Sequence, residues 1–224
     1  MKYRKVFWII GILLWVPIVV NGYIHKKEQL EIISVYRDRM KETEVDIAVQ
    51  CLKKARTYNE RLFQIKRERV VGSEERILNE KQYHSNLNLF ENGVMGMIEI
   101  PTIDLILPIY HGTQDSVLCQ GVGHLYGTSL PVGGNSTHSV LNGHRGFPSA
   151  ELFTRLDEIK NGDIFWIHVC GQKLTYKVVE IFVIEPNDVE KLDIVKGKDF
   201  VSLVTCTPYG INTQRLIVRG ERKV

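Results

Sequence analysis

Two residues near the C-terminus carry side chains that could perform acyl transfer together. Segment 200–220 holds two apolar, largely β-branched runs, and the loop between them contains Pro208 and Gly210, which is typical of a β-hairpin. The first run ends on Cys206 and the second opens on Arg215, so strand pairing would bring a thiol beside a guanidinium. A thiolate can attack a carbonyl carbon, and an arginine can stabilise the resulting oxyanion.

Such chemistry also needs a proton carrier, and the chain has seven histidines from which to choose. His144 follows a short apolar strand, Ser139–Asn142, in the stretch Ser-Val-Leu-Asn-Gly-His-Arg-Gly. His124, which follows Gly123, is its main rival. Cysteine and histidine partners meet in the fold rather than in the chain, so the distance of His144 from Cys206 in sequence is no objection.

These motifs resemble those of the sortases, the membrane-anchored cysteine transpeptidases of Gram-positive bacteria. The stretch Ser-Leu-Val-Thr-Cys at 202–206 is similar to the family pattern Thr-Leu-x-Thr-Cys, and Asn-Gly-His-Arg-Gly at 142–146 and Arg215 in Gln-Arg-Leu-Ile-Val also match. The stretches 121–134 and 207–212 are similar to class C, the pilus-building branch. The resemblance covers residues 90–222.

The resemblance implies a role for each matched residue. Cys206 would be the nucleophile, His144 the general acid and base, and Arg215 the stabiliser of oxyanion and substrate. Thr205 and Tyr209 would contact the bound peptide, although a strand position and a turn position explain these two equally well. No cofactor and no metal ion are implied.

The implied reaction cleaves a Leu-Pro-x-Thr-Gly-like sorting signal between Thr and Gly. The acyl group would pass to a pilin lysine, which makes sorting-signal proteins and pilin subunits the expected partners. Attachment of surface proteins to cell-wall peptide amines is the second hypothesis. A non-catalytic membrane-tethered module that binds pilins or sorting peptides is a third, and a thiol peptidase, which uses water as acceptor, is a fourth.

Composition restricts the remaining possibilities. A chain of 224 residues with 44% hydrophobic content can fill the core of one domain, and a net charge of +3 gives no basis for nucleic-acid binding. The four cysteines at 51, 119, 170 and 206 lack the spacing of a metal site. We expect Cys119 and Cys170 to be buried and Cys51 to lie on a helix face, rather than to form disulfides.

Residues 1–24 are predicted to form a membrane anchor. Lys2, Arg4 and Lys5 precede an apolar run that, extended to its interfacial end, is long enough to cross a hydrocarbon core of about 30 Å. A cleaved signal peptide is the alternative, but no small-x-small cleavage motif follows the run. The basic start predicts a single-pass cell-membrane protein with its catalytic domain on the extracellular face.

Residues 25–92 are predicted to form a helical stalk and an accessory segment. The stretch from His25 to Val70 lacks Gly and Pro, and an apolar stripe from Ala48 to Ile65 recurs at helical spacing. We expect this stripe to pack on the chain's own domain rather than on a partner. Class C sortases commonly carry an Asp-Pro-aromatic lid in this region, and here the tripeptide is absent, so either the lid is missing or 71–80 covers the site differently.

Residues 93–224 are predicted to be mainly β, because short apolar runs alternate with turn signals. Seven or eight strands imply a closed barrel or a sandwich, and the resemblance selects the sortase-type β-barrel with short helices. The expected strands are 94–100, 103–110, 139–142, 163–169, 173–184, 200–205 and 215–219. Short helices are expected at 116–120, 149–157 and 188–192.

Overall fold

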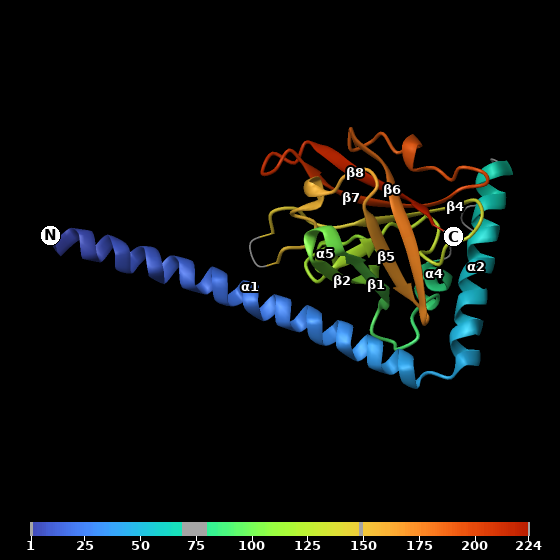
Figure 1. Ribbon diagram of the computed structural model, residues 1–224, viewed down its shortest axis with the longest axis horizontal. Helices are drawn as coiled ribbons and strands as arrows, with labels where there is room; N and C mark the ends of the chain where they lie inside the picture. The colour runs from blue at the N-terminus through green and yellow to red at the C-terminus, as the bar shows by residue number, and fades with distance from the viewer. Residues whose placement is uncertain (1, 69–79, 148–149, 224) are drawn as a thin grey trace.

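Residues 94–222 form a closed barrel of eight β-strands (Figure 1). The structure is a computed structural model that describes residues 2–68, 80–147 and 150–223, with backbone alone at 2–14, 18 and 68. Around the barrel the strand order is β1-β2-β3-β4-β7-β8-β6-β5. The strands are β1 (Val94–Ile100), β2 (Leu105–His111), β3 (Val122–His124), β4 (Thr137–Asn142), β5 (Ile164–Val169), β6 (Gln172–Ile184), β7 (Asp199–Thr207) and β8 (Gln214–Arg222).

The predicted barrel is therefore confirmed, with one strand that the sequence pattern did not indicate. Strand β3 has three residues with Gly123 at its centre, so it carries too little apolar alternation to stand out. It pairs in parallel with β2, and β4 pairs in parallel with β7, whereas the other neighbours are antiparallel. These parallel pairs join segments that are distant in the chain.

Side chains from alternate strand positions fill the barrel. Val201 and Leu203 of β7 and Leu216 and Val218 of β8 point inward into the main core. The intervening positions of the same strands face outward. Five of the outward residues on this side form a second apolar cluster, called here the outer apolar cluster: Val140, Ile184, Leu192, Val204 and Ile217.

Two long helices flank the barrel. Helix α1 (Lys2–Glu42) passes along one side of it, and α2 (Val45–Glu68) returns along another (Figure 1). Leu52, Ala55 and Leu62 of α2 belong to the main core, so the predicted packing of the apolar stripe on the chain's own domain is confirmed. Near its end, α1 contributes Ile33 and Tyr36 to a cluster against β1 and β2.

Among the residues whose side chains are described, no helix is both long and apolar enough to span a bilayer. Most of the predicted anchor, residues 1–24, lies outside these residues, since only its backbone is described up to position 14. The segment 71–80 that was considered as a cover for the site also falls outside the described residues, apart from Glu80.

The shorter helices agree with the sequence in two of three places. Helix α5 (Asp115–Leu118) and the 3-10 turn η3 (Glu190–Leu192) lie where helices were expected. The helix expected at 149–157 is wrong for the described residues, which form turns and the short η2 (Leu156–Glu158). A continuous helix cannot form there because Leu152 adopts a left-handed backbone with φ of 43°. Two further elements are α4 (Glu80–Ser85) and η1 (Pro101–Ile103).

Candidate active site

The hairpin of β7 and β8 places Cys206 directly opposite Arg215. Residues paired in this way lie on the same face of a sheet with adjacent side chains. Their face is the outer one, because Val204 and Ile217, two positions further from the loop, both belong to the outer apolar cluster. The thiol and the guanidinium therefore share one end of the barrel, where β4 and β7 end and β8 begins, called here the rim.

His144 reaches the same rim through the parallel pairing of β4 with β7. Asn142 is in register with Val204, and the Gly143 amide donates a hydrogen bond of 3.0 Å to the Val204 carbonyl. Strand β4 ends at Asn142, two residues before His144, and β7 continues from Val204 to Cys206, so the two residues follow the same paired segment toward the rim. The parallel pair thus closes the sequence gap between the histidine and the cysteine.

The imidazole of His144 is half-buried and held by a ring contact. It stacks on Phe147 with ring centroids 5.7 Å apart and planes inclined by 8°. In the described part of the chain neither ring nitrogen has a hydrogen-bond partner, so both are available to a substrate. The contact with Phe147 was not predicted, since an aromatic residue three positions beyond a histidine has no distinguishing pattern.

Thr205 connects the strand that carries Cys206 to the loop that carries His144. It lies on the inner face, is 2% exposed, and its hydroxyl donates a hydrogen bond of 2.8 Å to the Gly143 carbonyl. The hydroxyl therefore positions the two reacting groups relative to each other. Its predicted contact with bound peptide stays a prediction.

Arg145 is a second positioning residue, which the sequence pattern did not indicate. Its guanidinium forms a 2.5 Å ion pair with Asp157 and a 3.3 Å hydrogen bond to the Thr207 hydroxyl. It also lies 5.7 Å from the centroid of the Tyr209 ring. Because it contacts both the η2 region and the end of β7, Arg145 fixes the loop just after His144.

The Arg215 guanidinium is only partly occupied by its own loop. Its Nη1 donates to the carbonyls of Asn212 at 3.2 Å and Gln214 at 3.0 Å. An arginine has five N–H donors. Nε and Nη2 have no recorded partner in the described part of the chain, which leaves donors for an oxyanion beside Cys206.

Two of the other histidines are buried and hydrogen-bonded within the fold. His124 is fully buried, with Nδ1 3.0 Å from the Tyr83 hydroxyl and Nε2 2.8 Å from the Ser129 carbonyl, and burial lowers its pKa to about 4. His138 contacts the Ser202 hydroxyl at 2.8 Å, and burial lowers its pKa to about 4 as well. Both rings are neutral near pH 7 and buried, which favours the half-buried His144 over His124 as the proton carrier.

His111 and His168 also have fixed partners away from the rim. His111 Nε2 lies 2.7 Å from the Asn86 carbonyl, and His168 Nε2 lies 2.8 Å from the Glu99 carboxylate. Burial lowers the pKa of both imidazoles. His25 and His84 lie on α1 and α4, and neither element carries Cys206 or Arg215.

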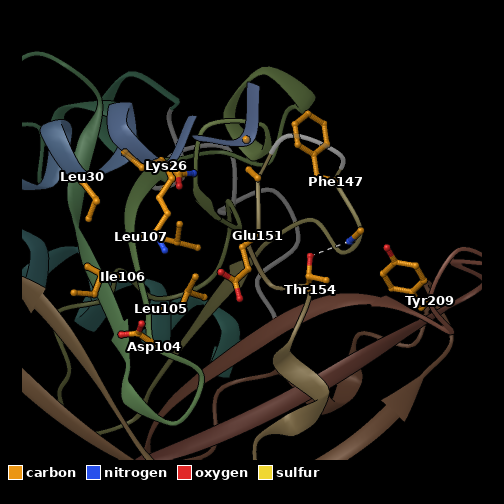
Figure 2. Close-up of a pocket in the computed structure, with 14 residues that line it drawn as sticks. Lys26, Leu30, Asp104, Leu105, Ile106, Leu107, Phe147, Glu151, Thr154 and Tyr209 are labelled. Carbon is orange, nitrogen blue, oxygen red and sulfur yellow. Dashed lines mark hydrogen bonds between the residues drawn. The ribbon is translucent and has the colours of Figure 1, made fainter. Parts of the chain in front are cut away.

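A cavity of about 600 Å³ lies next to the rim (Figure 2). Residues from α1, from the start of β2 and from the loop after His144 line it, together with Tyr209. Figure 2 shows the Glu151 side chain between the β2 residues and Thr154, whose hydroxyl accepts a 3.1 Å hydrogen bond from the Gly146 amide. Tyr209 is 60% exposed and lies against Gly146, where a Cβ would come within 2.9 Å of its ring.

Comparisons with known proteins identify the family and the fold of the chain. Residues 98–223 match a family model described as a Sortase domain. The structure is similar to that of sortase C1 from Streptococcus agalactiae, with TM-score 0.78 and 44% identity, covering 87% of this chain and 98% of that one. It is also similar to Clostridium perfringens sortase C solved with the C-terminal cell wall sorting motif, with TM-score 0.73, 41% identity and coverage of 87% and 99%.

A curated relative gives a shorter match. Sortase D of Bacillus subtilis is 31% identical over 130 residues, which cover 57% of this chain and 63% of that protein. The chain thus spans less than two thirds of this relative's length.

Proposed function

Because this chain belongs to the sortase family, we propose that it is a cysteine transpeptidase that transfers a sorting-signal acyl group to an amine. The observation that supports the proposal is the pairing of Cys206 with Arg215 at the end of β7 and β8, next to β4, the strand that precedes His144. A nucleophile, an oxyanion stabiliser and a proton carrier are the three parts that acyl transfer through a thioester requires.

The first half-reaction forms the acyl-enzyme. The Cys206 thiolate attacks the carbonyl carbon between Thr and Gly of a Leu-Pro-x-Thr-Gly-like signal, and the free donors of Arg215 stabilise the tetrahedral oxyanion. His144 then protonates the departing glycine amine, so the C–N bond breaks and a thioester remains.

The second half-reaction transfers the acyl group. An incoming amine gives a proton to His144 and attacks the thioester, and Arg215 stabilises the second oxyanion before the Cys206 sulfur departs. Water can take the place of the amine, and the product is then a free acid. Efficient transfer therefore depends on holding the amine near the rim.

The acceptor in this proposal is a pilin lysine, as the class C motifs imply. The cavity beside the rim supports a cationic acceptor, because its lining holds two carboxylates, Asp104 and Glu151, and one ammonium, that of Lys26. A cell-wall peptide amine would be attracted in the same way. The two acceptors must be separated by experiment.

The location of the enzyme is part of the same proposal. With residues 1–24 as a single-pass anchor, the catalytic barrel would lie on the extracellular face of the cell membrane. Gly22 and Lys26 of α1 line the cavity at the rim, so the reacting groups would lie close to the membrane surface. Sorting signals and pilins held at the membrane could reach the rim there.

The test is product analysis with two kinds of acceptor. The protein is incubated with a sorting-signal peptide and either a candidate pilin or a cell-wall peptide, and mass spectrometry locates the new bond. An isopeptide bond to a pilin lysine is expected in the native protein and absent in Cys206→Ala. A bond only to the wall peptide supports the second hypothesis, hydrolysis alone contradicts the transpeptidase, and cross-linking that survives Cys206→Ala indicates a non-catalytic binding module.

A further inference from the structure

A pair of cysteines far from the rim lies in direct contact. The Cys170 thiol is 3.1 Å from the Cys51 sulfur, and the two residues belong to the β5–β6 turn and to helix α2. We propose that Cys51 and Cys170 form a disulfide bond that fastens α2 to the barrel. The sequence predicted unpaired cysteines here, because a distance of more than one hundred positions gives no sign that the two segments meet.

Cys170 occupies a turn position that is unusual for a cysteine. Cys170 and Gly171 form the two-residue turn between β5 and β6, with φ of 43° and 75°. Asn and Asp are the residues usually found at the first position of such a turn, because left-handed backbone is unfavourable for most others. A cysteine at this position is explained by what its thiol touches.

The remaining geometry allows the bond to form with little movement. A disulfide has a sulfur–sulfur distance of about 2.04 Å, so the two sulfurs need to approach by about 1 Å. Cys170 is 3% exposed and Cys51 is half-buried, so an oxidant reaches Cys51 first. Tyr36 of α1 accepts a 3.2 Å hydrogen bond from the Cys170 amide, which holds the turn in place during the reaction.

The chemical environment favours Cys51 as the attacking thiolate. The hydrogen bond from the Cys170 thiol lowers the pKa of Cys51, with further contributions from the Leu87 backbone and the Lys54 charge, although burial opposes them. The same hydrogen bond, followed by burial, raises the pKa of Cys170. Of the two thiols, Cys51 is therefore the one that loses its proton first.

The oxidant is an external disulfide, whether a small molecule or a thiol oxidase. The Cys51 thiolate attacks one of its sulfurs, which forms a mixed disulfide and releases one thiolate. Cys170 then loses its proton and attacks the Cys51 sulfur, which releases the second thiol. The external disulfide gains two electrons and becomes two thiols, while the protein loses two hydrogens. An extracellular setting supplies such oxidants.

The bond would enclose the chain from α2 to the end of β5 in one covalent loop. Closing a loop of this size restricts the unfolded chain and stabilises the folded one. The expected stabilisation raises the melting temperature of a chain of this length by about 4–16 °C on oxidation. The rim lies at the opposite end of β6, where Ile184 pairs with Arg215, so the bond does not touch the reacting groups.

The test uses the full chain in a Cys206→Ala background, which removes the rim thiol. The protein is treated with oxidised or reduced glutathione, alkylated and digested with trypsin without reduction. We expect peptides 42–53 and 161–173 to appear as one linked species, lighter than their sum by two hydrogens, after oxidation only. Alkylation of both thiols in the oxidised, folded sample would overturn the proposal.

Thermal unfolding gives a second readout that compares each variant with itself. The oxidation-dependent rise in melting temperature is expected in the background protein and absent in Cys51→Ala, in Cys170→Ser and in the double variant. Cys119→Ala is the matched control and keeps the full rise, because this half-buried cysteine lies on the α5 side and contacts neither partner. A rise that survives Cys51→Ala, or none in the background protein, would contradict the bond.

Discussion

Replacing Thr205 with valine tests how the fold holds the loop of His144, the proposed proton carrier, against the strand of Cys206. Valine keeps the shape and the β-branched character of threonine but removes the hydroxyl that donates to the Gly143 carbonyl at 2.8 Å. His144 follows Gly143 directly, and Cys206 follows Thr205 directly. The hydroxyl is thus the shortest side-chain link between the two reacting residues.

The size of the effect follows from burial. Thr205 and Gly143 are both buried, so the carbonyl loses its partner without access to water, which lowers the free energy of unfolding by about 1–3 kcal/mol. The loop is then free to shift, and a displacement near 1 Å between reacting groups reduces a rate by about 10²-fold. We expect kcat to fall about 10- to 100-fold with little change in KM.

The assay is steady-state cleavage of a quenched fluorescent sorting peptide, paired with urea unfolding of the same samples. Thr205→Ser is the matched control, since it retains the donor, and it is expected to keep most of the activity and stability. If valine raised KM and left kcat and stability unchanged, Thr205 would instead be a peptide contact. If valine and serine behaved alike, the hydroxyl would have no positioning role.

Three further changes test other parts of the site and fold. Arg215→Ala is expected to lower kcat by about 10²–10³-fold. Arg215→Lys is expected to restore only part of the lost kcat, because its ammonium lacks the planar fork of donors. Equal activity of the native protein and both variants would contradict the role of Arg215. The double variant Asp104→Asn, Glu151→Gln is expected to raise KM for the amine acceptor about two- to fivefold in a transfer assay and to leave peptide hydrolysis unchanged. An unchanged KM would exclude the cavity as an acceptor site. His124 and His138 have folded-state pKa values of about 4, below the unfolded value of about 6.5, so the unfolded chain binds more protons as the pH falls. Urea unfolding should therefore show stability that is full above about pH 6.5 and lower by about 2 kcal/mol per histidine at about pH 5, with a smaller loss in His138→Asn, and pH-independent stability would refute the assignment.

The sequence was sufficient where structure is local. The pairing of Cys206 with Arg215 follows from two apolar runs and a turn, and the apolar stripe of α2 follows from helical spacing. Both patterns depend on residues that are near neighbours in the chain. Seven of the eight strands of the barrel were located for the same reason, and the short β3 was missed.

The sequence was insufficient where distant segments meet. Nothing in 139–142 indicates that β4 lies parallel to β7, yet this pairing brings His144 to the rim. Physical reasoning alone could not separate His144 from His124, because burial of an imidazole is decided by its tertiary neighbours. The positioning contacts of Arg145 and Thr205 were missed for the same reason, since each joins segments about sixty positions apart.

The turn at Cys170 and Gly171 contacts both long helices. The Cys170 amide donates a hydrogen bond to the Tyr36 hydroxyl of α1, and the Cys170 thiol contacts Cys51 of α2. Inserting or deleting one residue in this turn would therefore shift the contacts of both helices at the same time. Homologous chains should tolerate changes of length in their other hairpins more readily than here.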